Sequence, residues 1–123
     1  MTKYKIFITL CVALLFACDP EGNIDFYITN NCNENIDVYI SYAYGNQPAD
    51  TVRFVSAHSN IFIHTFVYNI AMSEKAVIKN EVYNVTVSNG DTLVNIEINP
   101  DDTTVWMFTH RRATLNINPE MFE

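Results

Sequence analysis

Three histidines, His58, His64 and His110, are the side chains of this sequence best suited to hold a transition metal or to move a proton. A zinc site needs three or four converging ligands, and histidines four residues apart on a helix or paired with cysteines are its usual sequence signal. No two of these histidines have that spacing, and no cysteine lies beside them. The sequence therefore predicts neither a metal site nor a cofactor.

Ser56 and His58 are a serine and a histidine close enough in sequence to suggest hydrolysis. A serine nucleophile usually occupies a glycine-rich turn beside backbone N–H groups that hold an oxyanion. Ser56-Ala57-His58 lacks these surroundings, so we expect no enzyme; a small envelope hydrolase that uses loop residues around His58 is the alternative. Four aspartates suggest calcium, but aspartate also favours turns, which is our expectation for them. They are Asp50, Asp91, Asp101 and Asp102.

Cys18 follows a segment that predicts a definite covalent chemistry. Lys3 and Lys5 precede an apolar run, 6–16, which is too short to span a bilayer and is typical of a secretory signal. Leu15-Phe16-Ala17-Cys18 resembles the lipobox of bacterial lipoproteins, with a small residue directly before the cysteine. The resemblance implies a signal peptide at 1–17 and a diacyl lipid on Cys18, with palmitate among its chains. An ordinary cleaved signal and an uncleaved anchor remain the alternatives.

The residues after Cys18 read as a short polar tether, 18–23, that joins the lipid to a domain at 24–123. Asp19 and Glu21 resemble the acidic export signal of Bacteroidetes surface lipoproteins. That resemblance implies the outer membrane of the cell envelope, with display at the cell surface. In an enterobacterial cell, Asp19 would instead imply retention in the inner membrane.

Charge and cysteine content restrict the partners. The chain has 7 basic and 14 acidic residues, and loss of Lys3 and Lys5 leaves 5 basic residues and a formal charge of −9. Nucleic acids require a basic surface, so we exclude them. Cys11 leaves with the signal and Cys18 carries lipid, so Cys32 alone cannot form an intramolecular disulfide.

From residue 24 onward apolar side chains alternate with polar ones, the pattern of half-buried strands. The run 61–68 is apolar on both faces, which predicts a central or covered strand. Residues 69–81 are expected to form an irregular crossover, and Asn118-Pro119 to begin a final helical turn. We predict an all-β, antiparallel, immunoglobulin-like sandwich of seven or eight strands, with a small closed β-barrel as the alternative. The expected strands are 24–29, 36–41, 51–56, 61–68, two arms within 82–97, 104–110 and 113–118.

Asn89-Gly90 lies between two alternating runs and predicts a two-residue type I′ hairpin, since both turn positions need positive φ. This loop length sets the register of the two arms. It places Val87 opposite Thr92, Val85 opposite Val94, and Tyr83 opposite Ile96.

Asp-Thr pairs occur three times and resemble the O-glycosylation acceptors of exported Bacteroidetes proteins, which would modify Thr51, Thr92 and Thr103. Ordinary turn and strand chemistry also produces such pairs.

Tyr42 and Tyr44 lie near the end of an expected strand, where aromatic side chains can stack on a sugar or anchor a protein. The tether would present them away from the membrane if the amino terminus lay at the opposite end of the domain. The sequence thus predicts a lipid-anchored, non-catalytic binding or structural module with a protein or carbohydrate ligand at Tyr42 and Tyr44. A carbohydrate-capture accessory, a fimbrial subunit and an inhibitor of a secreted effector all fit this description.

Overall fold

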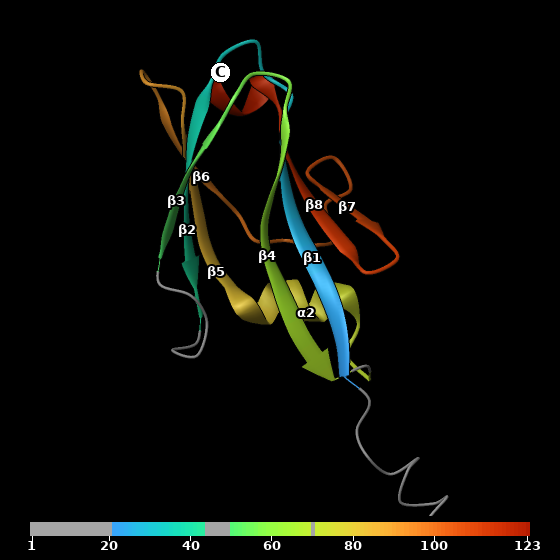
Figure 1. Ribbon diagram of the computed structural model, residues 1–123. Helices are drawn as coiled ribbons and strands as arrows, with labels where there is room; N and C mark the ends of the chain where they lie inside the picture. Colours follow the sequence, from blue (N-terminus) through green and yellow to red (C-terminus); the bar gives the residue numbers. More distant parts are fainter. Residues whose placement is uncertain (1–20, 44–49, 70) are drawn as a thin grey trace, which may run out of the picture.

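The computed structural model describes residues 21–43, 50–69 and 71–123. In this part of the chain, eight strands form two four-stranded sheets that pack face to face (Figure 1). One sheet has the strand order β4-β1-β8-β7, and the other β3-β2-β5-β6. The strands are β1 (Glu21–Asn30), β2 (Ile36–Tyr42), β3 (Thr51–Val55), β4 (Asn60–Asn69), β5 (Val82–Ser88), β6 (Leu93–Ile96), β7 (Trp106–Thr109) and β8 (Arg112–Ile117).

Alternation places the apolar side chains of both sheets in one shared core, as the sequence predicts. Ile24, Phe26 and Ile28 of β1 are fully buried, and Val38 of β2, in the other sheet, is buried in the same core. The all-β sandwich is therefore confirmed, and the closed barrel is wrong because the described strands form two sheets with free edges. The expectation of purely antiparallel pairing is also wrong. The hairpin of β7 and β8 leaves β8 running parallel to β1.

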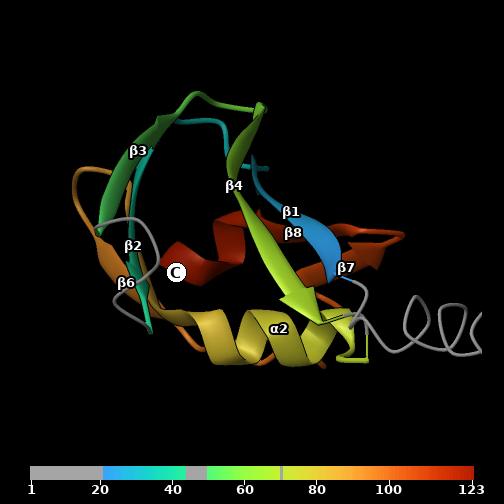
Figure 2. The same cartoon turned by 60° about the horizontal axis from the view of Figure 1, so that its bottom comes forward.

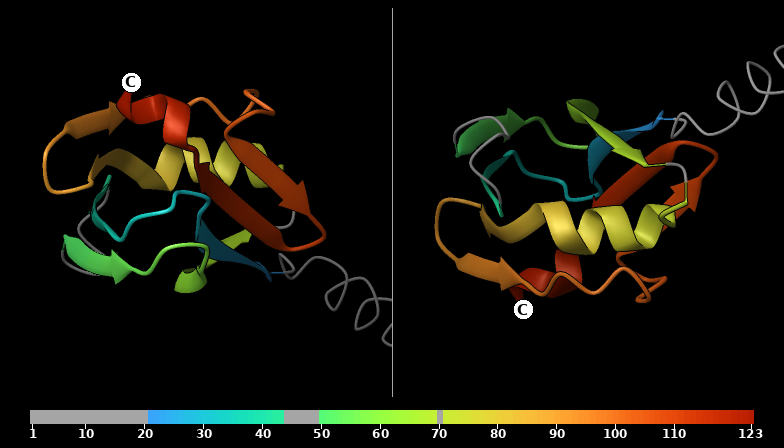
Figure 3. Two further views of the ribbon diagram at one scale, coloured as in Figure 1. Left: turned by 90° about the horizontal axis from the view of Figure 1, so that it is seen from above. Right: turned by 90° about the horizontal axis from the view of Figure 1, so that it is seen from below.

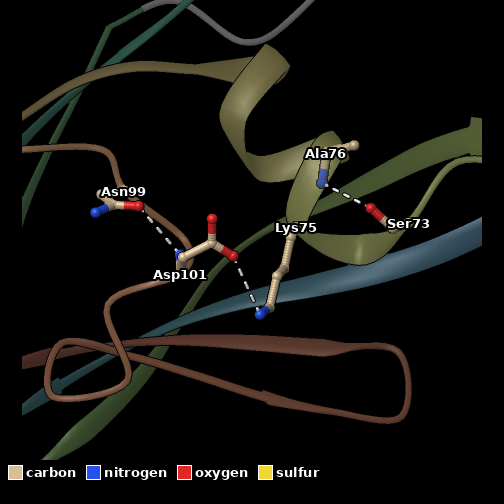
Figure 4. Close-up of polar contacts among 5 residues, drawn as sticks. All are labelled: Ser73, Lys75, Ala76, Asn99 and Asp101. Carbon is tan, nitrogen blue, oxygen red and sulfur yellow. Dashed lines mark hydrogen bonds and ion pairs between the residues drawn. The ribbon is translucent and has the colours of Figure 1, made fainter.

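Residues 74–81, expected in an irregular crossover, instead form an eight-residue helix, α2 (Glu74–Glu81). The Ser73 hydroxyl accepts a hydrogen bond from the Ala76 N–H at 3.1 Å, and so caps the first turn (Figure 4). Val77 and Ile78 are buried, and α2 lies across one end of the sandwich (Figure 2). Tertiary burial of two side chains thus selects a helix where the local pattern was ambiguous.

An ion pair connects α2 to the irregular segment before β7. Lys75 of α2 forms an exposed ion pair of 3.3 Å with Asp101, whose N–H donates to the Asn99 side chain (Figure 4). The predicted final turn is confirmed as the 3-10 helix η1 (Pro119–Phe122).

The strand predicted to be central, β4, lies at the edge of its sheet. Phe66 is buried, whereas Phe62 is 45% and Val67 59% exposed on the outer face. The prediction failed because it interpreted apolar residues on both faces as evidence that both faces are buried, whereas the outer face of β4 is exposed to solvent.

The β5–β6 hairpin pairs two residues away from the predicted register. Val87 lies opposite Val94, and Val85 opposite Ile96, with a four-residue loop between Ser88 and Leu93. Gly90 has a φ of 101°, but Asn89 is not among the residues with positive φ, so the turn is not type I′. A shift of two residues keeps every side chain on its face, so Val85 and Val94 share the core side as predicted.

A β-bulge corrects the prediction for Tyr83. Ser41 pairs with Asn84 but Tyr42 pairs with Val82, so Tyr83 is an extra residue in β5. The bulge turns Val82 into the core and leaves Tyr83 75% exposed, the reverse of the predicted arrangement.

Candidate functional site

A cluster of polar and titratable side chains lies between the two sheets near α2, in an interior that is otherwise mostly apolar. Each member is partly exposed, and the cluster takes side chains from β2, β3, β4 and the end of α2. Polar groups inside a sandwich are costly unless they are bonded, so such a group is a candidate site. We call it the inter-sheet cluster: Tyr42, Thr51, Arg53, His64 and Glu81.

Tyr42 is the centre of this cluster. It continues the inward alternation of β2 after Ile40, and its ring lies 5.8 Å from that of His64 and 6.0 Å from that of Phe66. Burial raises the pKa of the Tyr42 phenol, while a side-chain hydrogen bond with Thr51 and the charge of Arg53 oppose the rise. The phenol is therefore a neutral, positioned hydrogen-bonding group at physiological pH.

His64 faces the cluster because β4 carries a bulge. Phe26 pairs with His64 and Tyr27 pairs with Phe62, which leaves Ile63 as an extra residue. Ile63 and His64 therefore both point inward, and the His64 ring packs 4.9 Å from Phe66. Burial lowers the pKa of the His64 imidazole, and the charge of Glu81 opposes that decrease.

Arg53 supplies the cation of the cluster. Val52 and Phe54 are exposed on the outer face of β3, so alternation turns Arg53 to the inner face, opposite Val38 in β2. Within the described part of the chain, Arg53 has no ion pair. An arginine that is half-buried and has no ion pair with a described carboxylate is a candidate anion-binding residue.

The structure describes one of the two predicted ligand-binding tyrosines. Tyr42 belongs to the inter-sheet cluster, whereas Tyr44 lies outside the described residues, as does Cys18. Tyr42 ends β2 at the same end of the domain where β1 begins (Figure 1). For the tether to present Tyr42 away from the membrane, β1 would have to begin at the end of the domain opposite Tyr42. The structure does not have this arrangement.

The three predicted glycosylation residues also differ in their surroundings. Thr51 lies on the inner face of β3, where its side chain bonds with Tyr42. Thr92 is exposed in the β5–β6 loop, and Thr103 is exposed in the segment before β7. Thr92 and Thr103 are thus exposed, whereas Thr51 is half-buried.

The Ser56-His58 pair is not arranged as a nucleophile and base. The His58 ring is exposed and lies 2.8 Å from the Asn33 carboxamide oxygen. Ser59, not His58, donates to the Ser56 carbonyl, at 2.6 Å. Across residues 21–43, 50–69 and 71–123, no hydrogen bond joins the Ser56 hydroxyl to His58.

Asp102, one of the four aspartates considered for calcium, stabilises a turn. Asp102 accepts hydrogen bonds from the N–H and the hydroxyl of Thr104 at 3.0 and 2.6 Å, which lower the pKa of Asp102. Among the described residues, no group of three or more His, Cys, Asp or Glu side chains could hold a metal ion.

No protein-family model, curated protein or solved structure matches this chain. Within the part of the chain that the structure describes, no helix is long and apolar enough to cross a membrane.

Sequence reasoning missed Arg53, His64 and Glu81 as members of one site. Alternation in β3 offered a signal for Arg53, because Val52 and Phe54 occupy one face and leave Arg53 on the other. No local signal placed His64, because a bulge sets its direction, or Glu81, because it ends a helix that the sequence did not predict.

Proposed function

We propose that this protein is a lipid-anchored lipoprotein of the bacterial cell envelope, on the outer membrane and exposed at the surface, whose β-sandwich binds a ligand without catalysis. The lipobox-like sequence at Leu15 to Cys18 supports the anchor. The finer assignment to the immunoglobulin-like class belongs to the same proposal, supported by two four-stranded sheets packed face to face. Thr51, Thr92 and Thr103 are its candidate glycosylation sites, and the last two are exposed.

Cys18→Ala tests the anchor. Lipid chains supply membrane affinity of about 0.8 kcal/mol for each buried methylene, so the variant should move from the detergent phase to the aqueous phase on phase separation. Cys11→Ala is the matched control, because Cys11 lies inside the signal and should leave partition unchanged. A Cys18→Ala chain that stays in the detergent phase contradicts the assignment.

The ligand site of this proposal is the inter-sheet cluster. The observation that carries it is the half-buried Arg53 without an ion pair in the described residues, beside the phenol of Tyr42. The Arg53 guanidinium, whose charge acts on the Tyr42 phenol, and the half-buried Tyr42 ring suit a sugar that bears a carboxylate. We therefore expect an acidic carbohydrate to be preferred over a neutral one.

Oligogalacturonate and a neutral galactose oligomer of equal length are the probes for this site. The acidic oligomer should bind, and Arg53→Gln should weaken it about tenfold or more, the effect of one lost charged hydrogen bond. Arg112→Gln is the matched control, since Arg112 lies on the outer face, 4.0 Å from the centre of the Tyr27 ring. Titration calorimetry would reject this site if Arg53→Gln and Arg112→Gln bound alike, or if both oligomers bound equally.

A further inference from the structure

The free edge of β4 is the longest unpaired edge among the described strands. β4 has ten residues, whereas the other edge strands, β3, β6 and β7, have five, four and four. β4 pairs with β1 on one side, and no described strand pairs with its other side. In the end-on views, β3 and β4 lie on the same side of the sandwich, with the β4 edge uncovered by another strand (Figure 3).

β4 also lacks the charges that usually protect such an edge. Proteins guard exposed edges with lysine, proline, inward-pointing charges or short strands. β3 has an inward arginine, Arg53, but β4 contains no Lys, Arg, Asp, Glu or Pro. Its one protective feature is the bulge at Ile63, which faces β1. An edge of this length without charges is suited to pair with another strand.

The exposure of β4 is symmetric about its centre. Reading from either end, the residues are exposed, half-buried, exposed and buried, with two half-buried residues in the middle. The bulge creates this symmetry, because it shifts the alternation by one residue halfway along the strand. An isologous contact needs such a self-complementary surface, in which each residue meets its counterpart in the other copy.

We propose that β4 pairs antiparallel with β4 of a second copy of this chain, which joins the two sheets across a twofold axis. With the axis between His64 and Thr65, each end of β4 meets the opposite end of its partner. The four pairs outside the axis each lie on one face, whereas His64 and Thr65, which meet at the axis, lie on opposite faces because of the bulge. The pairs are Asn60 with Asn69, Ile61 with Tyr68, Phe62 with Val67, and Ile63 with Phe66.

Charge does not oppose a second copy at this edge, although it opposes contact elsewhere on the surface. The chain has a formal charge of −7, so two copies repel through most of their surfaces. β4 brings no charged side chain to the contact, so no like charges meet at any register. The contact also covers Phe62 and Val67, which are otherwise exposed apolar side chains.

Cysteine pairs test the register in the full-length protein. Two differently tagged copies are co-expressed, one with Phe62→Cys and the other with Val67→Cys, and membranes are oxidised before electrophoresis. A covalent heterodimer should form, because these two positions face each other across the axis. Val52→Cys replaces Val67→Cys as the matched control, since Val52 is 60% and Val67 59% exposed, both on outer faces of edge strands. Equal yield with Val52→Cys, or no heterodimer, overturns the proposal.

Analytical ultracentrifugation of the full-length chain with Cys18→Ala tests association without the proposed lipid. This chain should be dimeric, Val67→Lys should make it monomeric, and Val52→Lys should leave the dimer intact. A monomer before any β4 substitution overturns self-pairing, as does cross-linking of Phe62→Cys to a different protein in the membranes. Because this measurement needs no lipid, its result is separate from the success or failure of the anchor.

Discussion

Asn30 is the last residue of β1, and its side chain is fully buried. Its amide nitrogen donates to the carbonyls of Glu34, Val55 and Ser56 at 2.8, 3.1 and 3.2 Å, and its oxygen accepts from the Cys32 N–H at 2.9 Å. One carboxamide thereby joins the turn after β1 to the end of β3 in the other sheet. No apolar side chain can replace these bonds.

Asn30→Ala should lower the free energy of unfolding by about 3 kcal/mol, because it leaves several buried backbone groups without partners. Denaturant titration measures the change. Asn31→Ala is the control: Asn31 is exposed, its side chain donates to the Asn118 side chain, and its backbone bond to the Ile117 carbonyl survives the substitution, so the change should cost under about 1 kcal/mol. Equal losses would show that the buried carboxamide has no special part in stability.

His64 should make stability depend on pH. Burial lowers its pKa in the folded state below the ordinary 6.5, so the unfolded chain binds the proton more readily. The contribution of His64 is fully present above pH 6.5 and is lost as pH falls through the folded-state pKa. His64→Gln should therefore reduce the loss of stability between about pH 7.5 and about pH 5.5.

Denaturation midpoints at both pH values give this measurement. His58→Gln is the control for the loss of an imidazole, because His58 is exposed at a turn. If His64→Gln keeps the full pH dependence, burial of His64 is not its source.

At the scale of elements, the β5–β6 loop depends on Gly90, whose φ of 101° is strained for any side chain. A Cβ at this position would meet no atom within 4 Å, so backbone strain rather than a clash sets the cost. Gly90→Val should destabilise the domain by about 1–2 kcal/mol. Asp91→Val, in the same exposed loop but without positive φ, should change the melting temperature much less. Equal shifts for the two variants would contradict a backbone origin.

At the scale of the whole molecule, the excess of acidic residues opposes compaction. The full chain carries −7, and removal of the signal would leave −9. Salt screens this repulsion, so the melting temperature should rise between about 0.02 M and about 0.2 M NaCl. KCl should act equally, since screening does not depend on the cation. A fall in melting temperature would indicate that attractive ion pairs dominate instead.

The proposed dimer would also constrain the orientation of the molecule. A twofold axis between antiparallel β4 strands places the two starts of β1 at opposite ends of the joined sheet. Both tethers reach the same membrane only if the strands run along its surface, because the three residue steps from Cys18 to Glu21 span about 10 Å at most.

The sequence alone determined which side chains form much of the core. Alternation placed Ile24, Phe26 and Ile28 inside, and it kept Val85 and Val94 on one face even though the hairpin register was wrong. These predictions succeeded because the period of two is a local property of an extended chain.

Only the tertiary structure decided the edge position of β4, the helix at Glu74–Glu81 and the inward direction of His64. Each depends on a partner distant in sequence: β1 for the edge and the bulge, and the shared core for α2. Long-range pairing leaves no periodic trace in a single strand, so the inter-sheet cluster could not be assembled from the sequence. Tyr42 was found because it lies on the strand that alternation predicts, whereas Arg53, His64 and Glu81 came to it through folding.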